Sequence, residues 1–165
     1  RPNRRQRQMC IRDSSYIDIY PNITNTITAH DVQVNSITAW DQSVIRKGIP
    51  YELGKFNVNF KKSGEYKITL RRWPKESNLN LRDSIDDFIP AKKYWDQQSS
   101  GKSINIASAF IKIGNKEYKV DLSDNLKTAS INIDISSGKT SLEPGFILDN
   151  GQTSIAFYTD IDFLY

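Results

Sequence analysis

Residues 56–71 read FNVNFKKSGEYKITLR, and this stretch decides the fold class. Apolar side chains occupy every second position of residues 56–60 and again of residues 66–70. Side chains of a β-strand point alternately to the two faces of a sheet, so each segment predicts a strand with one buried face and one solvent-facing face. Lys62-Ser63-Gly64 supplies the turn between them, because glycine adopts the positive φ that tight turns demand. The stretch therefore predicts two antiparallel strands joined by a turn.

The same two-residue period recurs along the chain. It is present at residues 16–20 and 129–135, and turn sequences lie at Gly114-Asn115 and Ser136-Ser137-Gly138. Between residues 104 and 113 the apolar positions change parity midway. This change predicts a β-bulge, because one extra residue rotates the rest of the strand.

Helical spacing occurs in one place only. Leu81, Ile85, Phe88 and Ile89 predict one or two helical turns within the long excursion of residues 75–102. Strands at this density, with no helix–strand alternation, predict an all-β fold. We expect an antiparallel two-sheet β-sandwich, jelly-roll or immunoglobulin-like, with at most one short helix.

Length and composition fit one domain and exclude several classes of protein. A chain of 165 residues with 38% apolar residues can bury a core without disulfides. No apolar run approaches the roughly 20 residues of a membrane helix, so no membrane partner is expected. The single Cys excludes an internal disulfide framework, and the single His excludes a multi-histidine metal site.

The excess positive charge lies at the start of the chain. Residues 1–14 hold five of the 23 Lys and Arg and one of the 19 Asp and Glu, which accounts for the net charge of +4. A basic arm binds phosphates, but the string from Met9 to Ser14 resembles the translation of a sequencing-library adapter. We expect residues 1–14 to be a non-native or disordered tail, residues 15–165 to form a single β-sandwich domain, and no nucleic-acid partner.

The sequence supports no catalytic template. His30 is the single histidine and no Gly-x-Ser-x-Gly turn is present, so a Ser–His–Asp hydrolase lacks its parts. Asp86-Asp87, Asp160 and Asp162 offer carboxylates to a glycosidase, although such acids are usually solvated charge. No phosphate-binding glycine loop occurs, and no acidic cluster has the spacing of a dedicated calcium loop.

Aromatic and basic side chains are more informative. Trp40 and Trp73 are candidates for stacking on sugar rings, although most tryptophans of a small sandwich fill its core. Arg71 and Arg72 have the geometry to grip an anionic group such as sulfate, or to pair with Glu76 or with acids of a neighbouring domain. The residues alone leave these alternatives open.

Three segments together resemble a known domain. They are Trp40 to Gly48, Gly64 to Glu76, and Gly101 to Gly114, and the string LRRWPKE at residues 70–76 is the most distinctive part. They are similar to the C-terminal β-sandwich of bacterial arylsulfatases, enzymes of the alkaline-phosphatase-like superfamily. In that region a Trp-x-Gln-x-x-Ile-x-x-Gly segment precedes a Gly-x-Tyr strand that runs into Leu-Arg-Arg-Trp-Pro-x-Glu. The resemblance covers most of residues 16–165 and implies a family member truncated at its N-terminus.

The catalytic parts of that family have no counterpart in this chain. Sulfatases use a formylglycine made in a Cys/Ser-x-Pro-x-Arg motif beside a calcium ion, and no proline here has Cys or Ser two residues before it. The resemblance therefore implies a non-catalytic domain without a cofactor. Its implied partner is a sulfatase catalytic domain in cis, and its implied location is periplasmic or extracellular.

Two functions of different classes follow from these observations. The leading prediction is an accessory domain of an arylsulfatase-type sulfuric ester hydrolase, which packs on the catalytic domain and helps to shape its substrate entrance. The alternative is an autonomous carbohydrate-binding module for glycans, sulfated ones included; a generic adhesion or structural sandwich is a third possibility. The candidate interface or ligand-binding residues are Trp40, Gln42, Arg71, Arg72, Trp73 and Glu76.

Overall fold

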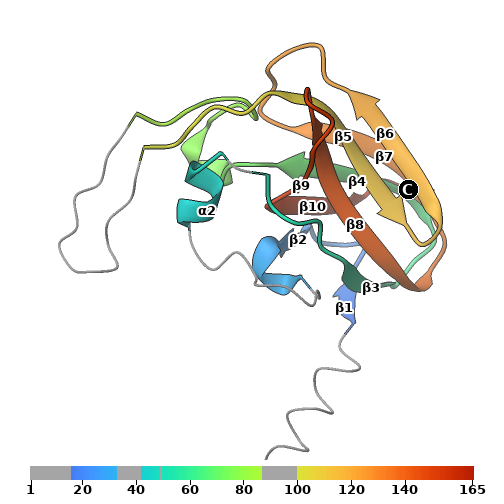
Figure 1. Ribbon diagram of the computed structural model, residues 1–165. Helices are drawn as coiled ribbons and strands as arrows, with labels where there is room; N and C mark the ends of the chain where they lie inside the picture. The colour runs from blue at the N-terminus through green and yellow to red at the C-terminus, as the bar shows by residue number, and fades with distance from the viewer. Residues whose placement is uncertain (1–15, 33–41, 49, 87–99) are drawn as a thin grey trace, which may run out of the picture.

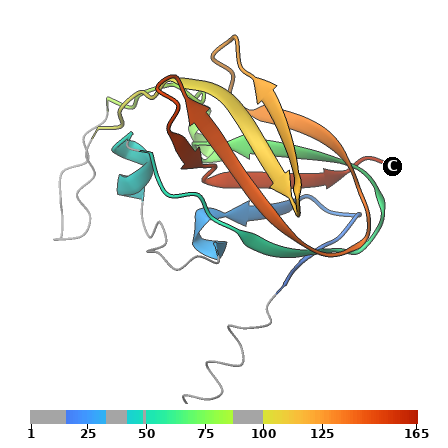
Figure 2. The same ribbon diagram turned by 45° about the vertical axis from the view of Figure 1, so that its right-hand side comes forward.

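Two β-sheets face each other in the computed structural model, which describes residues 16–32, 42–48, 50–86 and 100–165 (Figures 1 and 2). The segment expected to be a tail, residues 1–14, lies outside the described residues. Within the described part, strands dominate and helices are short, so the predicted two-sheet β-sandwich is confirmed.

The first sheet contains six strands, in the order β1-β3-β8-β5-β6, with β9 also paired to β8. The strands are β1 (Ile17–Ile19), β3 (Phe56–Phe60), β5 (Ile106–Ile113), β6 (Lys116–Asp121), β8 (Gly138–Leu148) and β9 (Thr153–Ile155). β1 runs parallel to β3 at one edge, and the other pairs of this sheet are antiparallel. The register between β5 and β8 shifts between Ile106 and Ser108, which confirms the predicted bulge.

The second sheet contains four strands, in the order β2-β10-β4-β7, all antiparallel. The strands are β2 (Asn25–Thr28), β4 (Gly64–Arg71), β7 (Ala129–Ile135) and β10 (Tyr158–Phe163). The two strands of the opening stretch, β3 and β4, therefore belong to different sheets, and the turn at residues 61–63 carries the chain from one sheet to the other. Gly64 has φ +150° there, and a Cβ on it would lie 2.4 Å from the carbonyl oxygen of Tyr165.

The hydrophobic core lies between the two sheets. The inward residues of β3 and β4 are at most 1% exposed; they are Phe56, Val58, Phe60, Tyr66, Ile68 and Leu70. Full burial of one such side chain stabilises the fold by about 1.5–3 kcal/mol, so this face sets the register of both strands.

The helix predicted around Leu81 and Ile85 is absent from the described residues. The backbone N–H of Leu81 donates to the carbonyl of Leu126 at 2.7 Å, and Ile85 forms a β-bridge with Gly101. Long-range backbone partners thus replace the hydrogen bonds of a helix, and Phe88 and Ile89 lie outside the described part.

Three short helices accompany the strands in the described residues. They are the α-helix α2 (Gln42–Arg46) and two 3₁₀-helices, η1 (Ala29–Asp31) and η2 (Lys75–Ser77). Helix α2 lies at the end of the sandwich opposite the C-terminus (Figure 1). In the described parts of the chain, no helix is long and apolar enough to cross a membrane.

Candidate functional site

The structure separates the six candidate residues into three groups. Trp40 lies outside the described residues, and of Gln42 only the backbone, in α2, is described. Arg72 and Trp73 lie in the interior, at 1% and 3% exposure. Arg71 and Glu76 line a cleft on the outer face of the second sheet.

Arg72 binds backbone carbonyls rather than an anion. Its guanidinium donates to the carbonyls of Ile45 at 3.0 Å, Lys102 at 2.6 Å and Asp83 at 3.1 Å. Burial lowers the pKa of Arg72 to about 10, an effect that the nearby negative charge of Asp83 partly opposes. The side chain therefore ties α2 to two chain segments at that end of the sandwich and presents no charge to solvent.

Trp73 packs beside Arg72 and closes the core. Its ring lies 4.2 Å from the Arg72 guanidinium carbon, an arrangement favourable for a cation–π interaction. Gly101 lies directly against the ring, because a Cβ on Gly101 would approach it to 2.9 Å. With neither face exposed, the indole is not available for stacking on a sugar.

Arg71, the last residue of β4, points to the outer face of the second sheet, because its neighbour Leu70 faces the core and adjacent residues of a strand point to opposite faces. Its Nε lies 3.1 Å from Asp160 Oδ2, and its Nη2 lies 3.0 and 2.9 Å from the two carboxylate oxygens. The guanidinium also lies 5.3 Å from the centre of the Tyr158 ring. Arg71 is 8% exposed, and Asp160 already neutralises its guanidinium. The charge expected to bind an anion or a neighbouring domain is therefore paired within the chain.

The cleft around this pair has a volume of about 400 Å³, and we call it the β2–β10 cleft. It is lined by Thr24, Thr26, Thr28, Arg71, Tyr158 and Asp160, with residues 74–76 beside them. Strand pairing explains the arrangement, since Thr26 lies opposite Asp160 and Thr28 lies opposite Tyr158. The volume falls within the range of about 300–1,000 Å³ that small-molecule sites occupy.

Threonine hydroxyls and aspartates form a ladder along this cleft. Thr26 Oγ1 donates to Asp160 Oδ1 at 2.7 Å, and Thr24 Oγ1 donates to Asp162 Oδ1 at 2.6 Å. Each hydroxyl that donates inward keeps oxygen lone pairs free to accept a hydrogen bond from a ligand. The cleft therefore offers fixed acceptors beside one aromatic ring, and the charges of Arg71 and Asp160 balance.

Sequence reasoning missed the threonines. Thr24, Thr26 and Thr28 stand at every second position, which places them on one face of a strand. That spacing was a usable signal, but only the strand order shows that β10 brings Asp160 and Tyr158 beside them.

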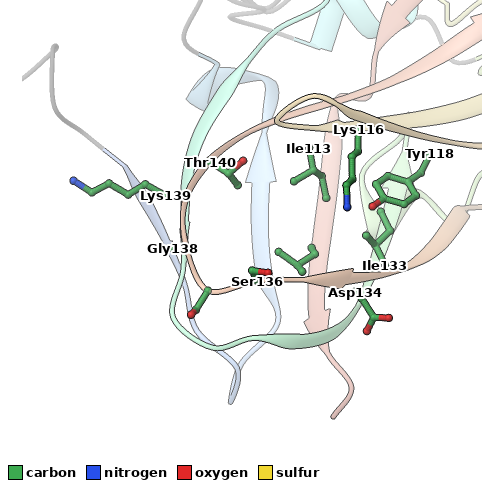
Figure 3. A pocket seen from close by; sticks show the side chains of 11 residues that line it. Ile113, Lys116, Tyr118, Ile133, Asp134, Ser136, Gly138, Lys139 and Thr140 are labelled. Carbon is green, nitrogen blue, oxygen red and sulfur yellow. The ribbon is translucent and has the colours of Figure 1, made fainter.

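Other hollows are also present among the described residues. One, of about 380 Å³, is lined by polar residues that include Asn105, Asp149 and Gln152. Another, of about 240 Å³, lies between β6 and β7 (Figure 3). In residues 16–32, 42–48, 50–86 and 100–165, no group of three or more His, Cys, Asp or Glu side chains is placed to hold a metal ion.

Comparison with known proteins gives structural likeness only. No family model and no curated protein matches the chain, so the resemblance to arylsulfatases stays a prediction. A ruminal GH26 endo-β-1,4-mannanase matches at 13% identity with a TM-score of 0.44; the match covers 89% of this chain and 27% of that one. The CBM35 of Abf62 from Cellvibrio japonicus matches at 11% identity with a TM-score of 0.43, covering 84% of this chain and 92% of that one.

A third similar structure is the GH26-CBM35 β-(1,4)-mannanase of Podospora anserina, at 10% identity and a TM-score of 0.39. This match covers 83% of the present chain, and the chain spans about 27% of the length of both mannanases. Likeness at these values carries no argument about what this chain binds.

Proposed function

We propose that this β-sandwich is a non-catalytic carbohydrate-binding module and that the β2–β10 cleft is its glycan site. The observation that carries the proposal is the meeting of the Tyr158 ring, the Arg71–Asp160 pair and a row of threonine hydroxyls in one cleft. A pyranose ring has an apolar C–H face and a rim of hydroxyls, so it needs one flat apolar partner and several fixed polar ones.

The charge balance of the cleft favours an uncharged sugar. Arg71 and Asp160 neutralise each other, and Lys75 and Glu76 contribute one charge of each sign. A sulfated ligand would compete with Asp160 for Arg71 and would leave a largely buried carboxylate unpaired, which costs free energy. Arg72 offers no substitute, because its guanidinium is engaged with backbone carbonyls in the interior.

The test is a calorimetric titration of the full chain with mannohexaose, xylohexaose and cellohexaose. We expect at least one of these uncharged oligosaccharides to bind, and Tyr158→Ala to weaken that affinity about tenfold because the ring is lost. Tyr158→Phe keeps the ring and serves as the matched control. Absence of binding by all three sugars, or equal affinity of Tyr158→Ala and wild type, would contradict the proposal.

A docking role on a sulfatase catalytic domain remains the second candidate, carried only by the LRRWPKE resemblance. Within that string Leu70, Arg72 and Trp73 are interior side chains, so they are not available as contacts for another domain. A docking surface would have to use other residues.

A further inference from the structure

The hollow between β6 and β7 has an apolar floor. It lies where the β5–β6 turn meets the β7–β8 turn, and Ile133 and Ile135 of β7 form its buried base. Ile113 and the ring of Tyr118 are half-buried beside them (Figure 3). At about 240 Å³ the hollow is smaller than most drug-sized sites, so it suits a single ring rather than an oligomer.

One cationic side chain enters this hollow. The Lys116 side chain points into it next to Tyr118, whereas Asp134 and Lys139 point away (Figure 3). The alternation of β7 explains the direction of Asp134, since Ile133 and Ile135 on either side of it face inward. Lys139 is placed with its amine 4.6 Å from the centre of the Tyr16 ring.

Lys116 differs from the other charged residues of its strand. Glu117 forms an ion pair with Lys112 at 3.5 Å, and Lys119 forms one with Asp121 at 3.5 Å. Among the residues that the structure describes, no ion pair includes Lys116. The amine thus stands beside an apolar floor without a carboxylate to neutralise it, a setting that favours an anionic ligand.

The rim supplies hydroxyl groups. Ser136 and Thr140 line the hollow on the side of the β7–β8 turn (Figure 3). An occupant therefore meets the Tyr118 ring, the half-buried side chain of Ile113, the hydroxyls of the rim and one positive charge.

We propose that this hollow binds one sugar unit carrying a negative charge, a carboxylate or a sulfate. The proposal rests on the glycan-binding function proposed above, and it adds a second contact for an acidic unit of the same class of ligand. The C–H face of the sugar lies on Tyr118 and on the half-buried Ile113, its hydroxyls reach Ser136 and Thr140, and its anionic group pairs with Lys116. Repulsion is small, because the nearest acid on β7, Asp134, faces the other way.

The test follows amide resonances of the full chain by NMR during titration with glucuronate, glucose 6-sulfate and glucose. We expect the amides of Ile133, Ser136 and Gly138 to shift with at least one charged sugar and not with glucose. A response to glucuronate alone assigns a carboxylate, a response to the sulfate alone assigns a sulfate ester, and a response to both assigns recognition by charge.

Lys116→Gln should weaken that binding about tenfold, because a charge-assisted hydrogen bond is lost. Lys119→Gln is the matched control on the same strand, and its affinity should stay within about twofold of wild type, since an exposed charge outside the site contributes little. No shift with either charged sugar, equal shifts with glucose, or an unchanged affinity of Lys116→Gln would overturn the proposal.

The experiments test the two proposed sites independently. Binding of uncharged hexaoses that depends on Tyr158, without a response of residues 133–138 to charged sugars, would sink the acidic site alone. A response at residues 133–138 without any hexaose binding would sink the role of the β2–β10 cleft alone.

Discussion

Arg71 on β4 and Asp160 on β10 form an ion pair with three nitrogen–oxygen distances between 2.9 and 3.1 Å. The two strands are neighbours, and Arg71 lies directly opposite Tyr158, two residues before Asp160. The pair is therefore diagonal, which brings the guanidinium towards the Tyr158 ring and leaves Asp160 Oδ1 able to accept from Thr26 as well. The Arg71–Asp160 pair thus contacts both the aromatic side chain of the β2–β10 cleft, Tyr158, and one of its hydroxyl groups, that of Thr26.

This ion pair should couple strongly in a double-mutant cycle. Its side chains are only 10% and 15% exposed, so Arg71→Ala leaves a carboxylate that is poorly solvated. We expect a coupling free energy of about 2 kcal/mol between Arg71→Ala and Asp160→Ala, measured by urea unfolding. The exposed pair Lys112–Glu117 is the control, and its coupling should be below about 0.5 kcal/mol. Similar values for the two pairs would contradict this account.

Thr26 should matter for glycan affinity, whereas Thr69 should not. Both threonines lie on the outer face of the second sheet, but only Thr26 lines the cleft; Thr69 is hydrogen-bonded to Ser130 at 3.0 Å. Thr26→Val removes the hydroxyl and leaves the shape almost unchanged, so the affinity for the bound hexaose should fall about fivefold. Thr69→Val should leave it within about twofold. Calorimetric titration of both variants measures these affinities. Equal losses of affinity in the two variants would show that the cleft is not the glycan site.

The sequence predicts strands better than it predicts which sheet receives them. Alternation in residues 56–60 and 66–70 marks both strands correctly, because burial of one face is a local property of the chain. The turn at residues 61–63 could belong to a hairpin or to a crossing between sheets, and nothing local distinguishes the two. Its crossing depends on Gly64 packing against Phe163 and Tyr165, residues about one hundred positions later.

The residues of the β2–β10 cleft could likewise be predicted only in part from the sequence. Arg71 and Glu76 were predicted as ligand or interface residues because they belong to one distinctive string. The strand β4 ends at Arg71, whose side chain lies on the outer face, whereas Arg72 lies just beyond the strand and its side chain enters the interior. Thr26, Tyr158 and Asp160 come from distant segments, and only strand pairing unites them.

Trp73 should prove essential to stability while its indole nitrogen is dispensable. Trp73→Ala opens a large cavity against Gly101 and Arg72, so the free energy of unfolding should fall by about 4 kcal/mol. Among the described residues the buried indole Nε1 has no hydrogen-bond partner, so we expect Trp73→Phe to lose no hydrogen bond and to cost about 1 kcal/mol. Urea unfolding of both variants is the measurement. A loss for Trp73→Phe as large as for Trp73→Ala would contradict this prediction.

Asp83 should contribute to the loss of stability in acid. The backbone N–H of Asn80 donates to its carboxylate at 2.8 Å and the Asn125 amide donates at 2.7 Å, and together they hold the pKa of Asp83 below its ordinary value of 3.8. A lower pKa in the folded state than in the unfolded state means that folding favours the ionised form. The contribution of Asp83 to the free energy of unfolding is therefore complete at pH values above its unfolded-state pKa, and it is lost as the pH falls through its folded-state pKa.

Asp83→Asn should accordingly be less stable than wild type at pH 7, and the difference between the two proteins should shrink towards pH 3. Urea unfolding midpoints at several pH values between these limits measure the effect. Asp86→Asn, three residues later on an exposed position, controls for the general change in net charge. Two outcomes would contradict this account. In one, the difference in stability between Asp83→Asn and wild type stays constant with pH. In the other, the difference between Asp86→Asn and wild type shrinks towards pH 3 in the same way.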